Sequence, residues 1–367
     1  MRYEIALCWD FLCKKWIKKR NIWEYVVNVL DDYPIDVIIY WVDGNDPEWV
    51  KEKRKYEQEK SSEESSGSIR YRDWDNLQYI FRGIEKFMPW VHKVFFVTCG
   101  HVPSWLNTCN SKIVLVKHSD YLSSDYLPTF SANPIELNFH RIRGLAEHFI
   151  VFNDDCFVTR KMKISDFFIN GMPVEQYMEY PIMTGGNAPV MGHILVNDFN
   201  MVGKYYTRHE LKSRLTRKIL SPKYGIYFFY NLIQFIVPYP RFYGLLTPHF
   251  PRPYLKSSFE ELWENEGEYL DMVSHNRFRD IKDVNIYIFR LWNMLKGNFI
   301  PGNVMKIGKA FWIDGSCTKI DKCIRKQKYK LICANDNCST DANFKKARAD
   351  INKALEFIMP DKSSFEL

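Results

Sequence analysis

The sequence predicts an α/β protein with a mainly parallel, Rossmann-like sheet flanked by helices and a more helical second half. Residues 37–42 form a run of six β-branched or aromatic residues. Such a run, without alternation, is typical of a strand buried on both faces of a parallel sheet. Strand-like and helical patterns then alternate as far as residue 155, which favours parallel pairing. Beyond that residue the pattern is less regular, and no internal repeat is visible.

The elements of the first half can be placed one by one. The strand at 37–42 is expected to end in a cluster of turn-forming residues, Asp43 to Pro47. The charged, serine-rich segment 51–68 is expected to be an exposed, mobile insertion, because it lacks the apolar residues of a core. The other expected elements are a helix at 77–90, strands at 93–100 and 112–122, a helix at 133–149 and a strand at 149–155.

Charge is unevenly distributed along the chain. The net charge is +7 over 367 residues. Residues 201–223 carry seven Lys or Arg against Glu210, a balance of +6, whereas residues 260–271 carry six acids and no base, a balance of −6. The basic segment suits a phosphate-bearing ligand or an anionic membrane surface, and a solvated helix face explains it equally well. No nucleic-acid-binding signature is present, so we expect no nucleic-acid partner.

The first 33 residues form a basic, amphipathic segment. Residues 1–20 hold six Lys or Arg against two acids, a charge of +4, and aromatic residues lie among the lysines. Such a helix can lie in a membrane interface, and the same pattern also suits a helix packed on the domain. We expect a cytoplasmic protein with peripheral contact to the anionic inner face of the cytoplasmic membrane through residues 1–30. The most apolar stretch, at 224–240, is interrupted by polar residues and is too short to span a bilayer.

The nine cysteines are an odd number, and four of them cluster late in the chain. These four are Cys317, Cys323, Cys333 and Cys338. No two cysteines have the C-x-x-C spacing that is typical of zinc sites, so zinc is the less favoured alternative. Free thiols in a reducing cytoplasm are the simpler interpretation.

Two acidic clusters are expected to meet at one edge of the sheet. Asp43 and Asp46 follow the first strand, and Asn153, Asp154 and Asp155 end the fourth. In open α/β sheets, ligands bind beyond the carboxyl ends of the strands. The pair Asp154-Asp155 can supply Mg²⁺ ligands for a phosphate-bearing substrate, can act as general acid or base, or can be an ordinary turn. Residue types and spacing leave these alternatives open.

A second group of candidates lies in the expected helix at 133–149. Asn133 fits an N-cap, Pro134 fits the first helical position, and Glu136 fits a capping box, so the carboxylate can be structural. His140 lies four residues after Glu136 and hence on the same helical face. A lone helical histidine is more often structural than catalytic.

Further candidates lie in the second half. His249 stands between Pro248 and Pro251, which either hold a titratable ring in place or mark a surface turn. Arg277 and Arg279 are near each other in sequence, and a guanidinium is a fitting partner for a diphosphate, although either residue can be an ordinary surface arginine. The sequence has no G-x-G-x-x-G motif and no Walker A loop.

Several longer segments, taken together and in this order, resemble one protein family. The segments "IDVIIYWVDGNDPEW", "RYRDWDNLQYIFRGIEKFMPWVHKVFFVTCGHVPSWLN" and "LPTFSANPIELNFHRIRGLAEHFIVFNDDCF" resemble the first two conserved regions of the Stealth family. "TPHFPRPY" resembles its third region, and "LICANDN" and "FIMPDKSSFEL" resemble its fourth. The resemblance runs from residue 35 to the C-terminus.

The resemblance implies a sugar-1-phosphate transferase, similar to bacterial capsule polymerases and to the animal lysosomal-enzyme N-acetylglucosamine-1-phosphotransferase. Such an enzyme transfers a hexose-1-phosphate, here expected to be an N-acetylhexosamine-1-phosphate, from a UDP-sugar to a saccharide hydroxyl and releases UMP. Mg²⁺ or another divalent cation is expected. The catalytic domain would span 34–367, with 201–300 as a helical, substrate-side part. The alternative is a metal-dependent glycosyltransferase, which would release UDP.

The resemblance also implies which residues form the site. The expected catalytic residues are Glu136, Asp155, His249 and Arg279. Arg277 is the alternative to Arg279, and His249 would be either a base or a nucleophile. Asp155, together with Asp154, is the expected metal ligand. The residues expected to bind the donor are Trp41, Asp43, Gly44, Arg70, Asp73, Asn133, His140 and Arg141.

Overall fold

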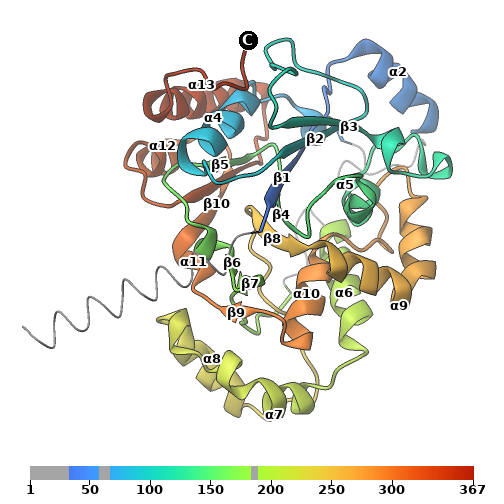
Figure 1. Ribbon diagram of the computed structural model, residues 1–367, viewed down its shortest axis with the longest axis vertical. Coiled ribbons are helices and arrows are strands. Elements are labelled where there is room, and N and C mark those ends of the chain that lie inside the picture. Colours follow the sequence, from blue (N-terminus) through green and yellow to red (C-terminus); the bar gives the residue numbers. More distant parts are fainter. Residues whose placement is uncertain (1–32, 58–66, 183–188) are drawn as a thin grey trace, which may run out of the picture.

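The computed structural model of the chain describes residues 33–57, 67–182 and 189–367. Its main sheet has the strand order β3-β2-β1-β4-β8 (Figure 1). The strands are β1 (Ile35–Tyr40), β2 (Val94–Thr98), β3 (Ile113–Lys117), β4 (His148–Phe152) and β8 (Arg252–Leu255). The first four pair in parallel, and β8 is an antiparallel edge strand beside β4. The predicted α/β class with a mainly parallel sheet is therefore confirmed.

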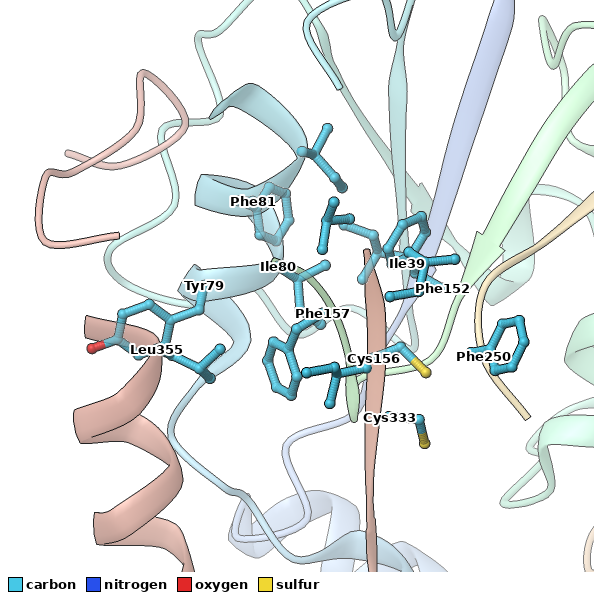
Figure 2. Close-up of a cluster of buried hydrophobic side chains, with 14 of the residues drawn as sticks. Ile39, Tyr79, Ile80, Phe81, Phe152, Cys156, Phe157, Phe250, Cys333 and Leu355 are labelled. Carbon is cyan, nitrogen blue, oxygen red and sulfur yellow. The ribbon is translucent and has the colours of Figure 1, made fainter. Parts of the chain in front are cut away.

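Alternate side chains of the main sheet pack on opposite faces. In β1, Val37 and Ile39 join one buried cluster, whereas Ile38 joins the other. The first cluster includes residues of α4 (Leu77–Phe87), β5 (Cys156–Val158) and α13 (Asp341–Ile358), and Figure 2 shows part of it. The second includes residues of α5 (Ala132–Leu137), α9 (Lys256–Ser274) and α10 (Tyr287–Lys296). Burial on both faces explains why the strands are continuous apolar runs.

Two smaller sheets were not predicted. One has the order β10-β11-β5, with β10 (Gly308–Ile313) parallel to β11 (Leu331–Asp336) and β5 antiparallel to β11. In this sheet Cys333 lies directly opposite Cys156. The other sheet has the order β6-β7-β9, with β6 (Phe168–Ile169), β7 (Met172–Glu175) and β9 (Ile300–Pro301).

The second half of the chain is more helical, as predicted. Its other helices are α6 (Pro189–Gly203), α7 (Arg208–Ile219), α8 (Tyr227–Ile236), α11 (Val304–Ile307) and α12 (Thr318–Arg325). Within the described residues, the 3₁₀ helices are η1 (Ser68–Tyr71), η2 (His118–Asp120), η3 (Ser124–Tyr126), η4 (Phe139–Arg141), η5 (Ile164–Asp166) and η6 (Pro222–Tyr224). Figure 1 shows α7 and α8 at one end of the molecule, away from the main sheet. None of the described helices is long and apolar enough to cross a membrane.

The segment expected to be a mobile insertion, 51–68, is partly helical. Helix α2 (Pro47–Tyr56) begins after Asp46, whose Oδ1 accepts a hydrogen bond of 2.7 Å from the backbone N–H of Trp49. Trp49 is buried against the rings of Tyr71 and Phe130, which fixes the helix on the domain. Residues 51–56 are therefore helical and, except for Lys53, exposed as predicted. The mobility of the segment stays a prediction, and residues 58–66 lie outside the described part.

The helix expected at 133–149 is much shorter than predicted. Ser131, not Asn133, is the N-cap, because its Oγ accepts a hydrogen bond from the Asn133 N–H. Helix α5 ends at Leu137, and η4 follows it. The side chain of Asn138 donates to the carbonyl of Pro134 at 2.8 Å, so it competes with the backbone for helix continuation. The predicted capping box at Glu136 is therefore wrong.

Candidate active site

Asp155 lies in the turn between β4 and β5, at the carboxyl edge of the main sheet. Cys156 Sγ donates a hydrogen bond to its Oδ1 and Cys333 Sγ donates one to its Oδ2, each at 3.1 Å. His249 Nε2 lies 3.5 Å from the same Oδ2. Burial would raise the pKa of Asp155, but the His249 ring and the two thiols outweigh it and hold that pKa below its ordinary value. Asp155 is therefore an ionised carboxylate with donors on both oxygens.

His249 lies in the loop that leads into β8, and both its ring nitrogens have partners. Nδ1 lies 3.1 Å from the hydroxyl of Tyr287, the first residue of α10, and Nε2 faces Asp155. Burial alone would lower the pKa of His249, whereas the carboxylates of Asp155 and Glu136 raise it above its ordinary value. A titratable ring is thus fixed beside an ionised carboxylate, an arrangement suited to proton transfer.

Glu136 is buried on α5 and faces the end of β1. The hydroxyl of Tyr40 donates a hydrogen bond of 2.5 Å to its Oε1. Burial raises the pKa of Glu136, although the Tyr40 hydroxyl and the charges of Arg279 and His249 oppose the rise. Because Glu136 and His249 each affect the pKa of the other, Glu136 belongs to the same site as the Asp155–His249 pair.

Of the two candidate arginines, Arg279 lies with the acidic residues. Its charge lowers the pKa of both Glu136 and His249. Arg277 instead donates to the carbonyl oxygen of Leu127 at 3.5 Å, and its guanidinium lies over the ring of Tyr56, 4.8 Å from the centroid. The geometry therefore favours Arg279 as the guanidinium that faces a substrate.

Asp154 lies at the open side of the site. Its side chain is exposed to solvent, and the carboxylates of Asp155 and Asp73 lie near it. Burial and the charge of Asp155 raise the pKa of Asp154 to about 7, and Asp73 adds to the rise. Burial also raises the pKa of Asp73, with Asp43 among the contributing charges. Carboxylates from three loops thus lie near one another, and we call this group the acidic mouth (Asp43, Asp73 and Asp154).

Comparison with known proteins identifies the family. The model of Stealth protein CR1, conserved region 1, matches residues 33–61, and that of Stealth protein CR2, conserved region 2, matches residues 70–175. The chain is 38% identical over 341 residues to the receptor polysaccharide phosphotransferase WefC of Streptococcus oralis, an alignment that covers 91% of this chain and 99% of that protein. This chain belongs to the Stealth family.

Other relatives have similar names. The Stealth chain is 35% identical over 333 residues to the capsular polysaccharide phosphotransferase WcwK of Streptococcus pneumoniae, covering 90% of this chain and 98% of that protein. It is 32% identical over 338 residues to the exopolysaccharide phosphotransferase cps2G of Lactiplantibacillus plantarum, an alignment that covers 91% of this chain and 96% of that protein. It is therefore a phosphotransferase. Among solved structures, the apo form of the bifunctional glycosyltransferase WbbM matches with a TM-score of 0.33 at 10% identity over 89% of this chain and 52% of that one, too little to support an argument.

Several of the residues expected to bind the donor of this Stealth enzyme lie beside the acidic mouth. Trp41 stacks on Phe96, and the backbone N–H of Asp43 donates to His101 Nδ1 at 3.0 Å. These contacts fix the turn that follows β1. Asp43 and Asp73 belong to the mouth itself.

Gly44 and Arg70 bring a second loop to the same place. A Cβ at Gly44 would lie 2.0 Å from the carbonyl oxygen of Tyr71, so only glycine allows this close approach of the two loops. Burial raises the pKa of Tyr71 to about 12, against the charges of Arg70 and Arg279. Both guanidiniums therefore lie near the Tyr71 ring, beside the acidic mouth.

The remaining donor-binding candidates have other contacts. Asn133 Nδ2 donates to Asp283 Oδ2 at 2.8 Å, which ties α5 to the loop that carries Arg279. The ring of His140 packs beside Trp263 of α9, and burial lowers the pKa of His140 to about 4. The guanidinium of Arg141 lies 4.4 Å from the centroid of Trp263. The structure thus places His140 and Arg141 against α9 and gives Asn133 a positioning contact.

Four residues of the site were not expected from the sequence, namely Tyr40, Cys156, Tyr287 and Cys333. Tyr40 ends an apolar strand and Tyr287 begins an apolar helix, so each is hidden in a core pattern. The two cysteines are buried at the edge of the cluster in Figure 2, and their thiols reach Asp155. In the sequence, the one indication of a role in the site was that Cys156 directly follows Asp154 and Asp155.

The donor set can be tested against the expected divalent cation. Within the described residues, the ligand atoms of Asp155, Cys156 and Cys333 lie within 4.8 Å of one another, but two thiols suit a soft cation better than Mg²⁺. The carboxylate of Asp154 reaches solvent beside Asp73. Mg²⁺ typically takes one or two carboxylates together with substrate phosphates, so the residues of the mouth fit it, with Asp154 the better placed ligand.

Proposed function

We propose that this chain transfers a hexose-1-phosphate from a UDP-sugar to a hydroxyl of a saccharide acceptor during synthesis of a capsule or another cell-surface polysaccharide. Its relatives are named phosphotransferases of capsular polysaccharide, receptor polysaccharide and exopolysaccharide. The observation that carries the proposal is the fixed Asp155–His249 pair with Glu136 and Arg279 around it. A base and a guanidinium beside an acidic mouth suit phosphoryl transfer to a hydroxyl.

In the proposed reaction, His249 takes the proton of the acceptor hydroxyl as its oxygen attacks the β-phosphorus of the donor. The bond from this phosphorus to the bridging oxygen breaks, and UMP leaves. The bond between sugar and phosphate stays intact, so the anomeric configuration is retained. Asp155 stabilises the imidazolium that forms, because its low pKa keeps it ionised. Attack by His249 itself, through a phosphohistidine, is the alternative route.

Arg279 and Glu136 act on the donor in this proposal. The guanidinium of Arg279 stabilises charge on the transferred phosphoryl group, because it is a fixed cation in a partly water-excluded site. Glu136 orients the donor sugar through its carboxylate, whose other partner is the Tyr40 hydroxyl. Arg70 and Trp41 border the side at which the nucleotide would lie.

A divalent cation is part of the proposal because of the charge of the mouth. Asp43, Asp73 and Asp154 would repel a diphosphate if they were all ionised. Asp154, with Asp155 nearby, would hold Mg²⁺, which would supply positive charge that offsets both the carboxylates and the diphosphate. The raised pKa of Asp154, about 7, reflects burial and the neighbouring charge of Asp155, which both oppose its ionisation.

Three further expectations stay proposals. A metal-dependent glycosyltransferase would use the same donor and a similar acidic mouth but would release UDP. Peripheral membrane contact through residues 1–30 concerns a segment outside the described residues, and the cytoplasmic location is likewise a proposal. The substrate-side role of 201–300 is supported by His249 and Arg279, which lie within that range.

The proposal is tested by incubating the purified chain with a panel of UDP-sugars, Mg²⁺ and capsule oligosaccharides and recording ³¹P NMR spectra. We expect a phosphodiester signal with a UDP-N-acetylhexosamine. The signal should be lost in Asp155→Asn and kept in Asp125→Asn, which changes an exposed aspartate of η3. Spectra without a phosphodiester across a panel that includes the cell's own surface oligosaccharides would contradict the proposal.

A further inference from the structure

The outward face of α8 exposes apolar side chains. Ile226, at the N-cap, is 77% exposed, and Phe229, Ile233 and Ile236 are 64%, 58% and 71% exposed. The buried residue of this helix is the polar Asn231. Tyr227 and Phe235 of the helix pack against the second core cluster, but the exposed residues leave a further apolar face outside it, whereas a surface helix usually turns its apolar residues to the core. We propose that this face, which we call the α8 face (Ile226, Phe229, Leu232, Ile233 and Ile236), binds the surface of an anionic lipid bilayer.

The spacing of these residues makes one continuous stripe. At about 100° per residue, the five positions of the α8 face fall within about 120° of the helix circumference. Asn231 lies on the opposite side of the helix, where its Nδ2 donates to the carbonyl oxygens of Tyr177 and Ile219 at 2.8 and 2.9 Å. The apolar stripe therefore points away from the domain as a consequence of specific polar contacts.

A buried arginine binds the C-terminal end of α8. Arg208 of α7 pairs with Glu179 at 2.7 Å and donates to the carbonyl oxygens of Gln234, Val237 and Tyr239 at 2.6, 2.9 and 2.9 Å. A cation at the carbonyl end of a helix is favourable because of the helix dipole. These contacts hold the helix in its orientation, and Figure 1 shows α7 and α8 at one end of the molecule. The α8 face can therefore meet a flat surface without rearrangement of the fold.

The charge around the helix indicates which partner covers this face. Residues 211–241, which run from α7 through α8 to the segment after it, contain six Lys or Arg and no Asp or Glu. Lys223 before the helix and Arg241 after it are exposed. An apolar stripe flanked by bases matches an interfacial helix on anionic lipid. A symmetric contact with a second copy of this chain would instead bring Lys223 and Arg241 of both copies to one interface, where like charges oppose association.

The length of α8 limits the mode of contact. Ten residues rise about 15 Å, half of a bilayer core, so the helix can lie in the interface but cannot span it. This surface is distinct from residues 1–30, and it does not depend on the proposed reaction. It would hold the enzyme at a membrane that carries its acceptor or its product.

The experiment measures co-sedimentation of the full chain with lipid vesicles. One set of vesicles contains phosphatidylglycerol in phosphatidylcholine, and the other contains phosphatidylcholine alone. The variants are Phe229→Gln/Ile233→Gln on α8 and, as a matched control, Phe357→Gln on α13. Phe357 has the same exposed fraction as Phe229, 64%, and is also helical. Thermal unfolding and molar mass in solution are recorded for each protein.

We expect the parent chain to bind the phosphatidylglycerol vesicles, with binding that weakens in high salt. The α8 double variant should bind at least about tenfold more weakly because two large apolar side chains are lost, and the Phe357 variant should bind like the parent. Unchanged binding of the double variant, or no vesicle binding by the parent, would overturn the inference. So would a parent dimer that the double variant converts to a monomer, because a second copy would then cover the face. Transfer to a soluble acceptor, measured in parallel, should not change.

Discussion

A buried ion cluster beneath the site gives the sharpest prediction about stability. Glu175 of β7 accepts two hydrogen bonds of 2.8 Å from Arg290 of α10 and lies 2.9 Å from Arg252 of β8, and all three side chains are at most 2% exposed. Arg252 follows His249 by three residues, and Arg290 follows Tyr287 by three. The cluster therefore fixes both elements that hold the His249 ring. The substitution Glu175→Gln removes its only negative charge.

The expected loss in the free energy of unfolding follows from the charges that Glu175→Gln leaves in the cluster. The cluster carries one negative and two positive charges, so Glu175→Gln leaves two buried guanidiniums with no counter-ion among them. Removing one partner of a buried ion pair costs about 3–5 kcal/mol, whereas an exposed pair contributes about 0–1 kcal/mol. Arg252 Nε and Arg290 Nη1 already lack partners in the described structure, so little compensation is at hand. We expect a loss of about 3–5 kcal/mol in the free energy of unfolding at pH 7.

The pH dependence provides a second readout. Burial would raise the pKa of Glu175, but Arg252 and Arg290 outweigh it and lower that pKa. A carboxylate with a lowered pKa stabilises the fold above its unfolded pKa, and this contribution is lost as the pH falls through the folded value. The difference between parent and Glu175→Gln should therefore shrink below about pH 4.5, the ordinary pKa of a glutamate.

The assay is urea unfolding of parent and variant, with Glu48→Gln as the control. Glu48 pairs with Lys51 on the surface, where both side chains are largely exposed, so this change should cost less than about 1 kcal/mol. The double variant Glu175→Gln/Arg290→Met should recover part of the loss, because one unpaired charge is removed with its partner. A loss for Glu175→Gln no larger than that of the surface control would refute the argument.

Three further predictions concern the site itself. His249→Ala should lower the rate of nucleotide release by at least about 100-fold while the fold is kept, and near-parental turnover would exclude its role in proton transfer or attack. Asp155→Asn should lower the pKa of His249, since burial then acts without the carboxylate that raises it; ¹³C-labelled histidine NMR measures this, and an unchanged pKa would contradict the pair. Gly44→Ala should cost about 1–3 kcal/mol of stability because its Cβ would meet the Tyr71 backbone. The control Gly267→Ala, whose Cβ would meet no atom within 4 Å, should not destabilise the fold. Equal melting temperatures for the two variants would contradict the close approach of Gly44 to Tyr71.

The sequence was sufficient for the parallel part of the main sheet. The strands β1, β2 and β4 are buried on both faces, so nearly all of their residues are apolar. Such a continuous apolar run can be recognised in the sequence without knowledge of which strands pair. β8 was missed because it contains Pro253, which looks like a loop residue in sequence. Proline is tolerated there because β8 is the edge strand of the sheet.

The predicted site depended on contacts that only the fold reveals. Asp155 and Glu136 could be named from the resemblance, but local patterns gave Glu136 a place in a capping box, which is excluded because the helix begins after Ser131 and not after Asn133. The distinction between Arg277 and Arg279 was out of reach, since it depends on which one lies near Glu136. Cys333 lies far from Asp155 in sequence and meets it through the pairing of β5 with β11.

The proposed reaction breaks the diphosphate and not the bond between sugar and phosphate. The most direct measurement is chromatographic analysis of the nucleotide released when the chain is incubated with a UDP-N-acetylhexosamine, Mg²⁺ and acceptor. We expect UMP, in amounts equal to the phosphodiester formed. UDP as the product would contradict it and would identify a glycosyltransferase.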